Sequence, residues 1–149
     1  MTSVGPRDLE GGVAPFGQSI RRRLPPTLID SGPDETPVVV LIAEDPRTSH
    51  RAFEAMRIAV GIVAGENKVV VVLTGPAVHL LDADTDELVD GDDIAKFRAS
   101  LRKLGVPFHV EVSSKPLEPH WNEEGHEVVA VTREQIAGVL RGARRSLIF

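Results

Sequence analysis

The chain contains no cysteine and no tyrosine, and its 149 residues include one tryptophan and five phenylalanines. Without cysteine there are no disulfides, thiolate zinc sites, iron–sulfur clusters or cysteine nucleophiles. A small secreted scaffold built on disulfides is therefore excluded. With so few aromatic side chains, a platform that stacks nucleic-acid bases has few candidate residues.

Basic residues are in the minority, with 17 Lys and Arg against 22 Asp and Glu, so the net charge is −5. A general nucleic-acid binder needs a basic face to neutralise phosphates, so we expect no nucleic-acid partner. The longest uncharged apolar stretch, residues 58–65, is far shorter than the about 18 residues of a membrane span. No apolar signal region follows the first methionine. We expect a cytoplasmic protein with no membrane segment.

Glycine and proline concentrate in residues 1–37, which hold six of the eleven prolines and five of the thirteen glycines. This part of the chain has almost no apolar periodicity and cannot bury enough apolar surface to offset its ordering entropy. We predict a flexible or partner-ordered N-terminal arm over residues 1–36. Residues 37–149 form the predicted α/β domain, a length that suits one domain.

Within that domain, β-branched runs alternate with helical patterns. Two continuous apolar runs predict strands that are buried on both faces, and an alternating run predicts a strand nearer an edge, with one wetter face. The strands are expected at 38–43, 69–73, 106–112, 128–131 and 146–149, and the helices at about 50–64, 77–81, 94–104 and 133–140. The order predicts a three-layer α/β/α fold with a mainly parallel, about five-stranded sheet.

The first long helix has an unusual second half, because residues 58–65 are apolar on every side. A helix that is apolar all round is covered on more than one side. We expect the sheet to cover one side and a second subunit the other, which predicts an oligomer.

Ligands of open α/β sheets bind beyond the carboxyl ends of the strands. The residues at those ends make a tentative pocket for a small molecule, consisting of Glu44, Asp45, His50, Gly75, His79 and Ser113. No dinucleotide fingerprint, P-loop, serine-hydrolase elbow or zinc-protease motif is present. We therefore assign no catalytic residue, no cofactor and no metal ligand.

Two other chemistries are weaker alternatives. A hydrolase or lyase could use a carboxylate, from Glu44 or Asp45, and an imidazole, from His50 or His79, for acid–base catalysis. The sequence does not show that these groups meet. The acidic run from Asp82 to Asp86 lacks the glycine and glutamate of a calcium loop. Whether the histidines of residues 109–126 bind a metal is left open.

The segment from Val38 to Phe149 resembles the DsrE/DsrF-like family, which includes sulfur-relay subunits. The matching pieces are the acidic-Pro turn after the first strand (43–46), the Ala-rich helix (52–64), the Gly-x-x-Val-x-x-Leu turn (75–81) and the terminal helix and strand (135–149). The resemblance implies a small cytoplasmic α/β subunit that forms trimers or hexamers of one or several related chains.

Some members of that family carry sulfur as a persulfide on a cysteine that follows the third main strand. Ser113 is the nearest counterpart in this chain, and a hydroxyl without an activating base forms no persulfide. The resemblance thus implies a non-catalytic oligomeric accessory or binding subunit connected with sulfur metabolism, and not a persulfide carrier. The alternative is a small-molecule or nucleotide sensor that uses the strand-tip pocket.

Overall fold

Five parallel strands form one sheet in the computed structural model, which describes residues 36–149. The strand order is β6-β5-β4-β3-β7, and every neighbouring pair is parallel. The strands are β3 (Val38–Ile42), β4 (Val69–Leu73), β5 (Phe108–Glu111), β6 (Val128–Val131) and β7 (Arg145–Ile148).

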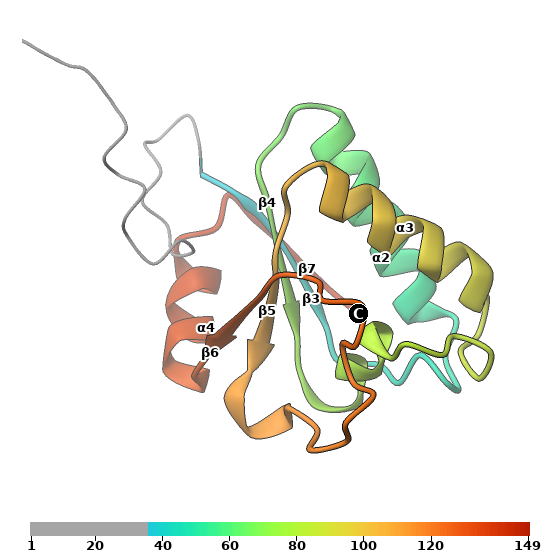
Figure 1. The fold of residues 1–149 in the computed structure, drawn as a ribbon. Coiled ribbons are helices and arrows are strands. Elements are labelled where there is room, and N and C mark those ends of the chain that lie inside the picture. The colour runs from blue at the N-terminus through green and yellow to red at the C-terminus, as the bar shows by residue number, and fades with distance from the viewer. Residues whose placement is uncertain (1–35) are drawn as a thin grey trace, which may run out of the picture. The chain divides into compact units, whose positions relative to one another are not determined.

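Helices lie on both sides of the sheet, so the predicted three-layer α/β architecture is confirmed (Figure 1). The long helices are α2 (Arg51–Ala64), α3 (Gly91–Lys103) and α4 (Arg133–Arg141), and the 3₁₀ helices are η4 (Gly75–Leu81) and η5 (Val112–Ser114). From β3 to β6 the chain steps across the sheet in one direction, with α2 and α3 on one side. The connection from β6 to β7 runs back across the sheet, and because such crossovers are right-handed, α4 lies on the opposite side.

The predicted N-terminal arm, residues 1–36, lies outside the described residues except for Thr36. Within residues 36–149, no helix combines the length and the apolar character that crossing a membrane requires.

The two central strands are buried on both faces, as their continuous apolar runs predict. Val40 and Val71 are paired neighbours that belong to the main core beneath α2 and α3, and both have no exposed surface. Val39 and Val70 are the next pair along and face the other side, with 0% and 7% exposure. Burial on both faces explains why these strands show no polar alternation.

The expectation of a wetter face on the third strand is wrong. All four residues of β5 are buried, including His109 at 3% exposure and Glu111 at 7%. Both residues face the side of the sheet on which α4 lies, and Arg133 of α4 binds Glu111 directly. The polar position at the end of this strand is thus paired with an arginine from later in the chain.

Local signals fix some helix ends better than others. The capping box at α4 is present as predicted, with Thr132 Oγ1 accepting from Gln135 N at 3.1 Å and Gln135 Oε1 accepting from Thr132 N at 2.9 Å. At α2, the Ser49 hydroxyl accepts from Arg51 N at 3.1 Å. Asp90 occupies the N-cap position of α3, but its side chain makes no cap hydrogen bond there.

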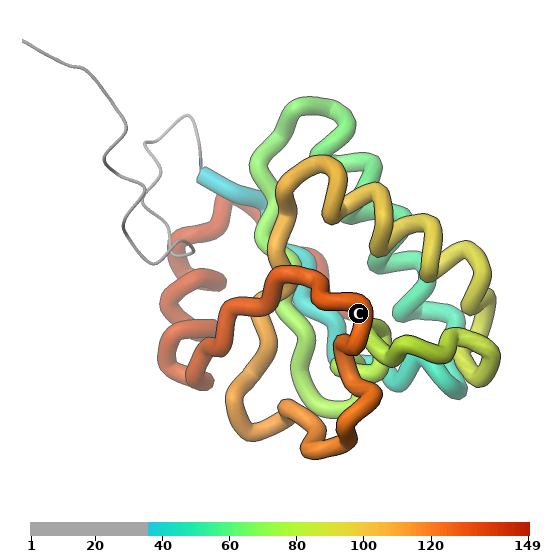
Figure 2. Tube along the Cα trace, in the orientation of Figure 1, coloured from blue at the N-terminus to red at the C-terminus, as the bar shows by residue number. Residues whose placement is uncertain are grey.

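The connection from β5 to β6 contains no long helix. Residues 115–127, which we call the strap, run back along the α3 side of the sheet instead (Figure 2). The strap is fastened to η4, because Trp121 Nε1 donates to the carbonyl of Val78 at 2.8 Å and Asn122 N donates to that of Leu81 at 3.0 Å. A loop thus takes the place in this layer that a helix takes in the other crossovers.

The apolar second half of α2 is partly covered by the chain itself. α3 packs beside α2, with the rings of Phe53 and Phe97 5.6 Å apart, and Val60, Ile62 and Val63 pack against the core. Ile58 is half-buried and lies outside that core cluster. The assembly expected from this helix stays a prediction, and Ile58 is the residue at which to test it.

A glycine at the start of α3 permits a close approach of two backbone segments. A Cβ atom on Gly91 would lie 2.0 Å from the carbonyl oxygen of Thr85, whereas one on Gly61, inside α2, would meet nothing within 4 Å. We predict that Gly91→Ala lowers the free energy of unfolding by about 2–3 kcal/mol through overpacking. Gly61→Ala should raise it by about 0.4–1 kcal/mol, since alanine restricts the unfolded chain. Urea denaturation measures both, and equal effects would contradict the described contact.

Candidate functional site

The acidic turn after β3 is closed by its own arginine. Asp45 accepts hydrogen bonds from Arg47 through N (2.9 Å), Nε (3.0 Å) and Nη2 (3.0 Å). The hydrogen bonds from Arg47 hold the pKa of the Asp45 carboxyl below its usual value, and those same bonds raise the pKa of Arg47. The side chain of Arg47 is thereby fixed at the carboxyl end of the sheet.

The ends of β4, β5 and β6 are joined by a second polar cluster. Gly75 N donates to Ser114 Oγ at 2.8 Å, and that hydroxyl donates to Glu111 Oε1 at 3.2 Å. Arg133 Nε donates to Glu111 Oε2 at 2.9 Å, and this hydrogen bond is the main reason that the pKa of Glu111 is lowered. Gly75 has φ of +55°, a conformation that glycine adopts without strain.

The six residues of the predicted pocket do not converge on one place. Gly75 lies at the Glu111 cluster, and exposed Ser113 adjoins it. His50 lies elsewhere, with Nδ1 2.8 Å from Asp90 and Nε2 3.2 Å from Glu54.

Glu44 is exposed, and Asp45 binds Arg47. Of the six predicted residues, His79 lines the cavity described next. The sequence places these six residues after strand ends but does not show which side chains meet, and the strand-tip pocket stays a prediction.

A cavity of about 330 Å³ lies at this edge on the α3 side, between the turn after β3, the end of η4 and the strap. It is lined by Arg47, His79, Asp82, Ala83, Asp84, Glu87, Glu118, His120 and Trp121. The volume falls in the range of about 300–1,000 Å³ that small-molecule sites occupy. The acidic run at 82–87 and the single tryptophan were the sequence signals for this site, but only the fold brings them together.

The polar groups of the cavity have defined orientations. His79 Nδ1 lies 3.0 Å and 3.1 Å from the two carboxylate oxygens of Asp82, and its side chain is 16% exposed. Trp121 is held by its bond to Val78, and the Lys115 ammonium lies 5.9 Å from the centre of its ring. The cavity thus has one aromatic wall and several hydrogen-bond acceptors.

No three His, Asp or Glu side chains within residues 36–149 are placed to hold a metal ion. His109 and His126 are buried, whereas the side chain of His120 is 80% exposed and lies 3.2 Å from Glu123. The groups that line the cavity are thus charged side chains, hydrogen-bond acceptors and one aromatic ring.

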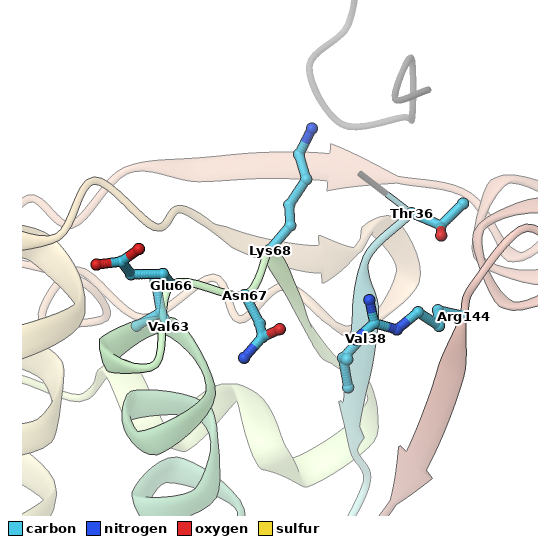
Figure 3. A pocket seen from close by; sticks show the side chains of 7 residues that line it. All are labelled: Thr36, Val38, Val63, Glu66, Asn67, Lys68 and Arg144. Atoms are coloured by element: carbon cyan, nitrogen blue, oxygen red, sulfur yellow. The ribbon is translucent and has the colours of Figure 1, made fainter. Parts of the chain in front are cut away.

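A second cavity, of about 410 Å³, lies at the opposite, amino end of the sheet, beside β3 and β4. Figure 3 shows the guanidinium of Arg144 beside Val38, while the ammonium of Lys68 points away from the other side chains. The charged groups that line this second cavity do not converge on one point, so the cavity gives no indication of which class of ligand it would bind.

A buried arginine fastens the strap. The side chain of Arg98 is 1% exposed, and Nη1 donates to the carbonyls of Leu80 (2.9 Å) and Asp82 (2.7 Å) while Nη2 donates to Glu124 Oε1 (3.0 Å). On the exposed side, Arg102 Nη2 donates to the carbonyls of Glu124 and Gly125. Arg98 thus ties the end of η4 to the strap, and these two segments form walls of the 330 Å³ cavity.

Burial lowers the pKa values of two histidines, His109 and His126. Burial lowers the pKa of His126, with Arg98 and Arg102 acting in the same direction and Glu124 opposing them. Burial likewise lowers the pKa of His109, although its contact with the Val71 carbonyl opposes the shift. Within residues 36–149, His126 Nδ1 and His109 Nε2 have no hydrogen-bond partner.

Comparison with known proteins supports the fold. No protein-family model matches the chain, and no curated protein matches it in sequence. A solved structure similar to it is the crystal structure of the YchN protein from E. coli, with a TM-score of 0.57 and 19% identity. The match covers 76% of this chain and 99% of YchN, so the chain has a DsrE-like fold. At this level of identity the likeness concerns the fold alone.

We predict that Arg98→Met lowers the free energy of unfolding by about 3 kcal/mol or more, because it leaves buried carbonyls and Glu124 without their charged donor. Arg57→Met is the matched control, since Arg57 is exposed and binds Glu54 on the surface of α2. Exposed ion pairs contribute at most about 1 kcal/mol, so the control should lose little. Similar losses by urea denaturation would refute the role assigned to Arg98.

Stability should depend on pH through the two buried histidines. Their folded pKa values lie below the ordinary 6.5, so the unfolded chain binds protons that the folded chain does not. Their contribution is complete above pH 6.5 and is lost as the pH falls from there toward the folded pKa values. Urea denaturation at several pH values should show this loss. His126→Gln should reduce it and His120→Gln, at an exposed position, should not.

Proposed function

We propose that this chain is a non-catalytic accessory or binding subunit connected with sulfur metabolism, and that it carries no persulfide itself. The observation that carries the proposal is the combination of a DsrE-like fold with a chain that has no cysteine. A persulfide needs a thiolate, and no side chain of this sequence supplies one.

The surroundings of Ser113 are consistent with a binding role. Ser113 is exposed at the end of β5, and the adjoining carboxylate of Glu111 accepts hydrogen bonds from Arg133 and Ser114. The lowered pKa of Glu111 makes this carboxylate a weak base. A serine beside such a carboxylate lacks the general base that activates a hydroxyl nucleophile.

We expect the chain to form an oligomer and to join cysteine-containing DsrE/DsrF-like subunits when they are co-expressed. Native mass spectrometry of the purified material measures both. Ile58→Asp should shift the assembly toward monomers without loss of helix content by circular dichroism, because Ile58 lies outside the core cluster. Glu54→Gln, on the same helix, is the control for a surface change that leaves Ile58 intact. A chain that forms no mixed complex under any condition would rule out the accessory role.

A second candidate function is a small-molecule sensor, and the 330 Å³ cavity is the observation that favours it. Its walls come from three separate segments, the turn after β3, η4 with the following acidic loop, and the strap. A ligand that contacts all three would stabilise their mutual arrangement, and a partner subunit could detect that change. The two functions are compatible, since an accessory subunit can report on a ligand.

A further inference from the structure

The cavity at the carboxyl end of the sheet has a strong excess of negative charge. Four carboxylates line it, those of Asp82, Asp84, Glu87 and Glu118, against one permanent cation, Arg47. Both side-chain hydrogen bonds of Arg47 go to Asp45, so this guanidinium is already paired. Asp82 and Glu118 add to the negative potential around it and help to raise its pKa.

His79 adds a further acceptor. Because Nδ1 faces both carboxylate oxygens of Asp82, that nitrogen carries the proton in the neutral ring. Nε2 is then a lone-pair acceptor, and it has no hydrogen-bond partner among residues 36–149. The side chain of His79 lines the cavity and is 16% exposed. A donor on a ligand would satisfy this nitrogen.

The aromatic wall already attracts a cation. The Lys115 ammonium lies 5.9 Å from the centroid of the Trp121 ring, within the range of a cation–π contact. Lys115 comes from the exposed start of the strap, whereas Trp121 is fixed by its hydrogen bond to Val78. The chain's own ammonium therefore stands in for the kind of group that this ring favours.

We propose that this cavity binds a small organic cation whose ammonium or guanidinium group donates N–H hydrogen bonds. The inference rests on the sensor function proposed above and names its ligand class. A metal ion is disfavoured, because no three donor side chains within residues 36–149 converge to hold one. An anion is disfavoured because it would meet four carboxylates and one guanidinium that is already paired.

Trp121 provides a direct readout, because it is the single tryptophan of the chain and no tyrosine is present. Its fluorescence would be titrated at constant ionic strength with 1,4-diaminobutane, methylammonium and guanidinium. Succinate and inorganic phosphate are the anionic probes. We expect a saturable change with the cations at concentrations up to about 10 mM, and none with the anions.

Charge-neutral variants locate the binding. The side chains of Glu87 and Glu118 make no hydrogen bond to another residue of 36–149, so Glu87→Gln and Glu118→Gln should leave the fold intact. Each should weaken cation binding about fivefold, the effect of one near charge in water. Asp92→Asn and Glu134→Gln, at acids that do not line the cavity, are the matched controls and should bind as the wild type does.

Three results would overturn the proposal: saturable binding of the anions alone, no saturable binding of any cation, or equal binding by the wild type and the Glu87→Gln/Glu118→Gln double variant. Binding of the anions would still leave a sensor with a different ligand class. None of these results bears on the mixed complexes measured by native mass spectrometry, so failure of this proposal and failure of the accessory role are distinguishable.

Discussion

The guanidinium of Arg98 holds together the part of the molecule on which any binding role depends. It is almost fully buried, and it joins two backbone carbonyls at the end of η4 to a carboxylate in the strap. Burial lowers its pKa, but Glu124 and Asp82 oppose that shift, and arginine stays protonated. Hydrogen bonds are directional, whereas apolar packing is not. The three hydrogen bonds from Arg98 therefore fix the positions of η4 and the strap more strictly than apolar contacts would.

This constraint follows from the topology. Parallel strands need a crossover, and a helix normally covers the sheet there. Between β5 and β6 the chain instead uses the strap, which has few apolar side chains with which to pack. Trp121, Asn122 and Glu124 fasten it through hydrogen bonds to η4 and α3. The result is a cavity walled by polar loops at the edge where open α/β sheets bind ligands.

Most of the sheet could be predicted from sequence, because the strands are short β-branched runs and the α4 capping box is a local signal. What the sequence could not show are contacts between distant segments. Arg98 looks like a surface residue of an amphipathic helix, and His109 like a residue on a wet strand face, yet both are buried. His50 follows the end of β3 in sequence, but its side chain contacts Asp90 at the start of α3 and does not line the cavity. The spacing of apolar residues along the sequence predicts helices and strands. Contacts such as that of His50 with Asp90 depend on how those helices and strands pack together.

The strap is closed over η4, and the indole N–H of Trp121 tests that closure most directly. With a single tryptophan, the protein gives one indole signal in a two-dimensional NMR spectrum, and hydrogen exchange can be followed at that proton alone. A strap closed by the 2.8 Å bond to Val78 predicts exchange that is much slower than that of a free indole. Exchange as fast as in an unfolded peptide would show an open strap and would contradict both the cavity and the role of Arg98.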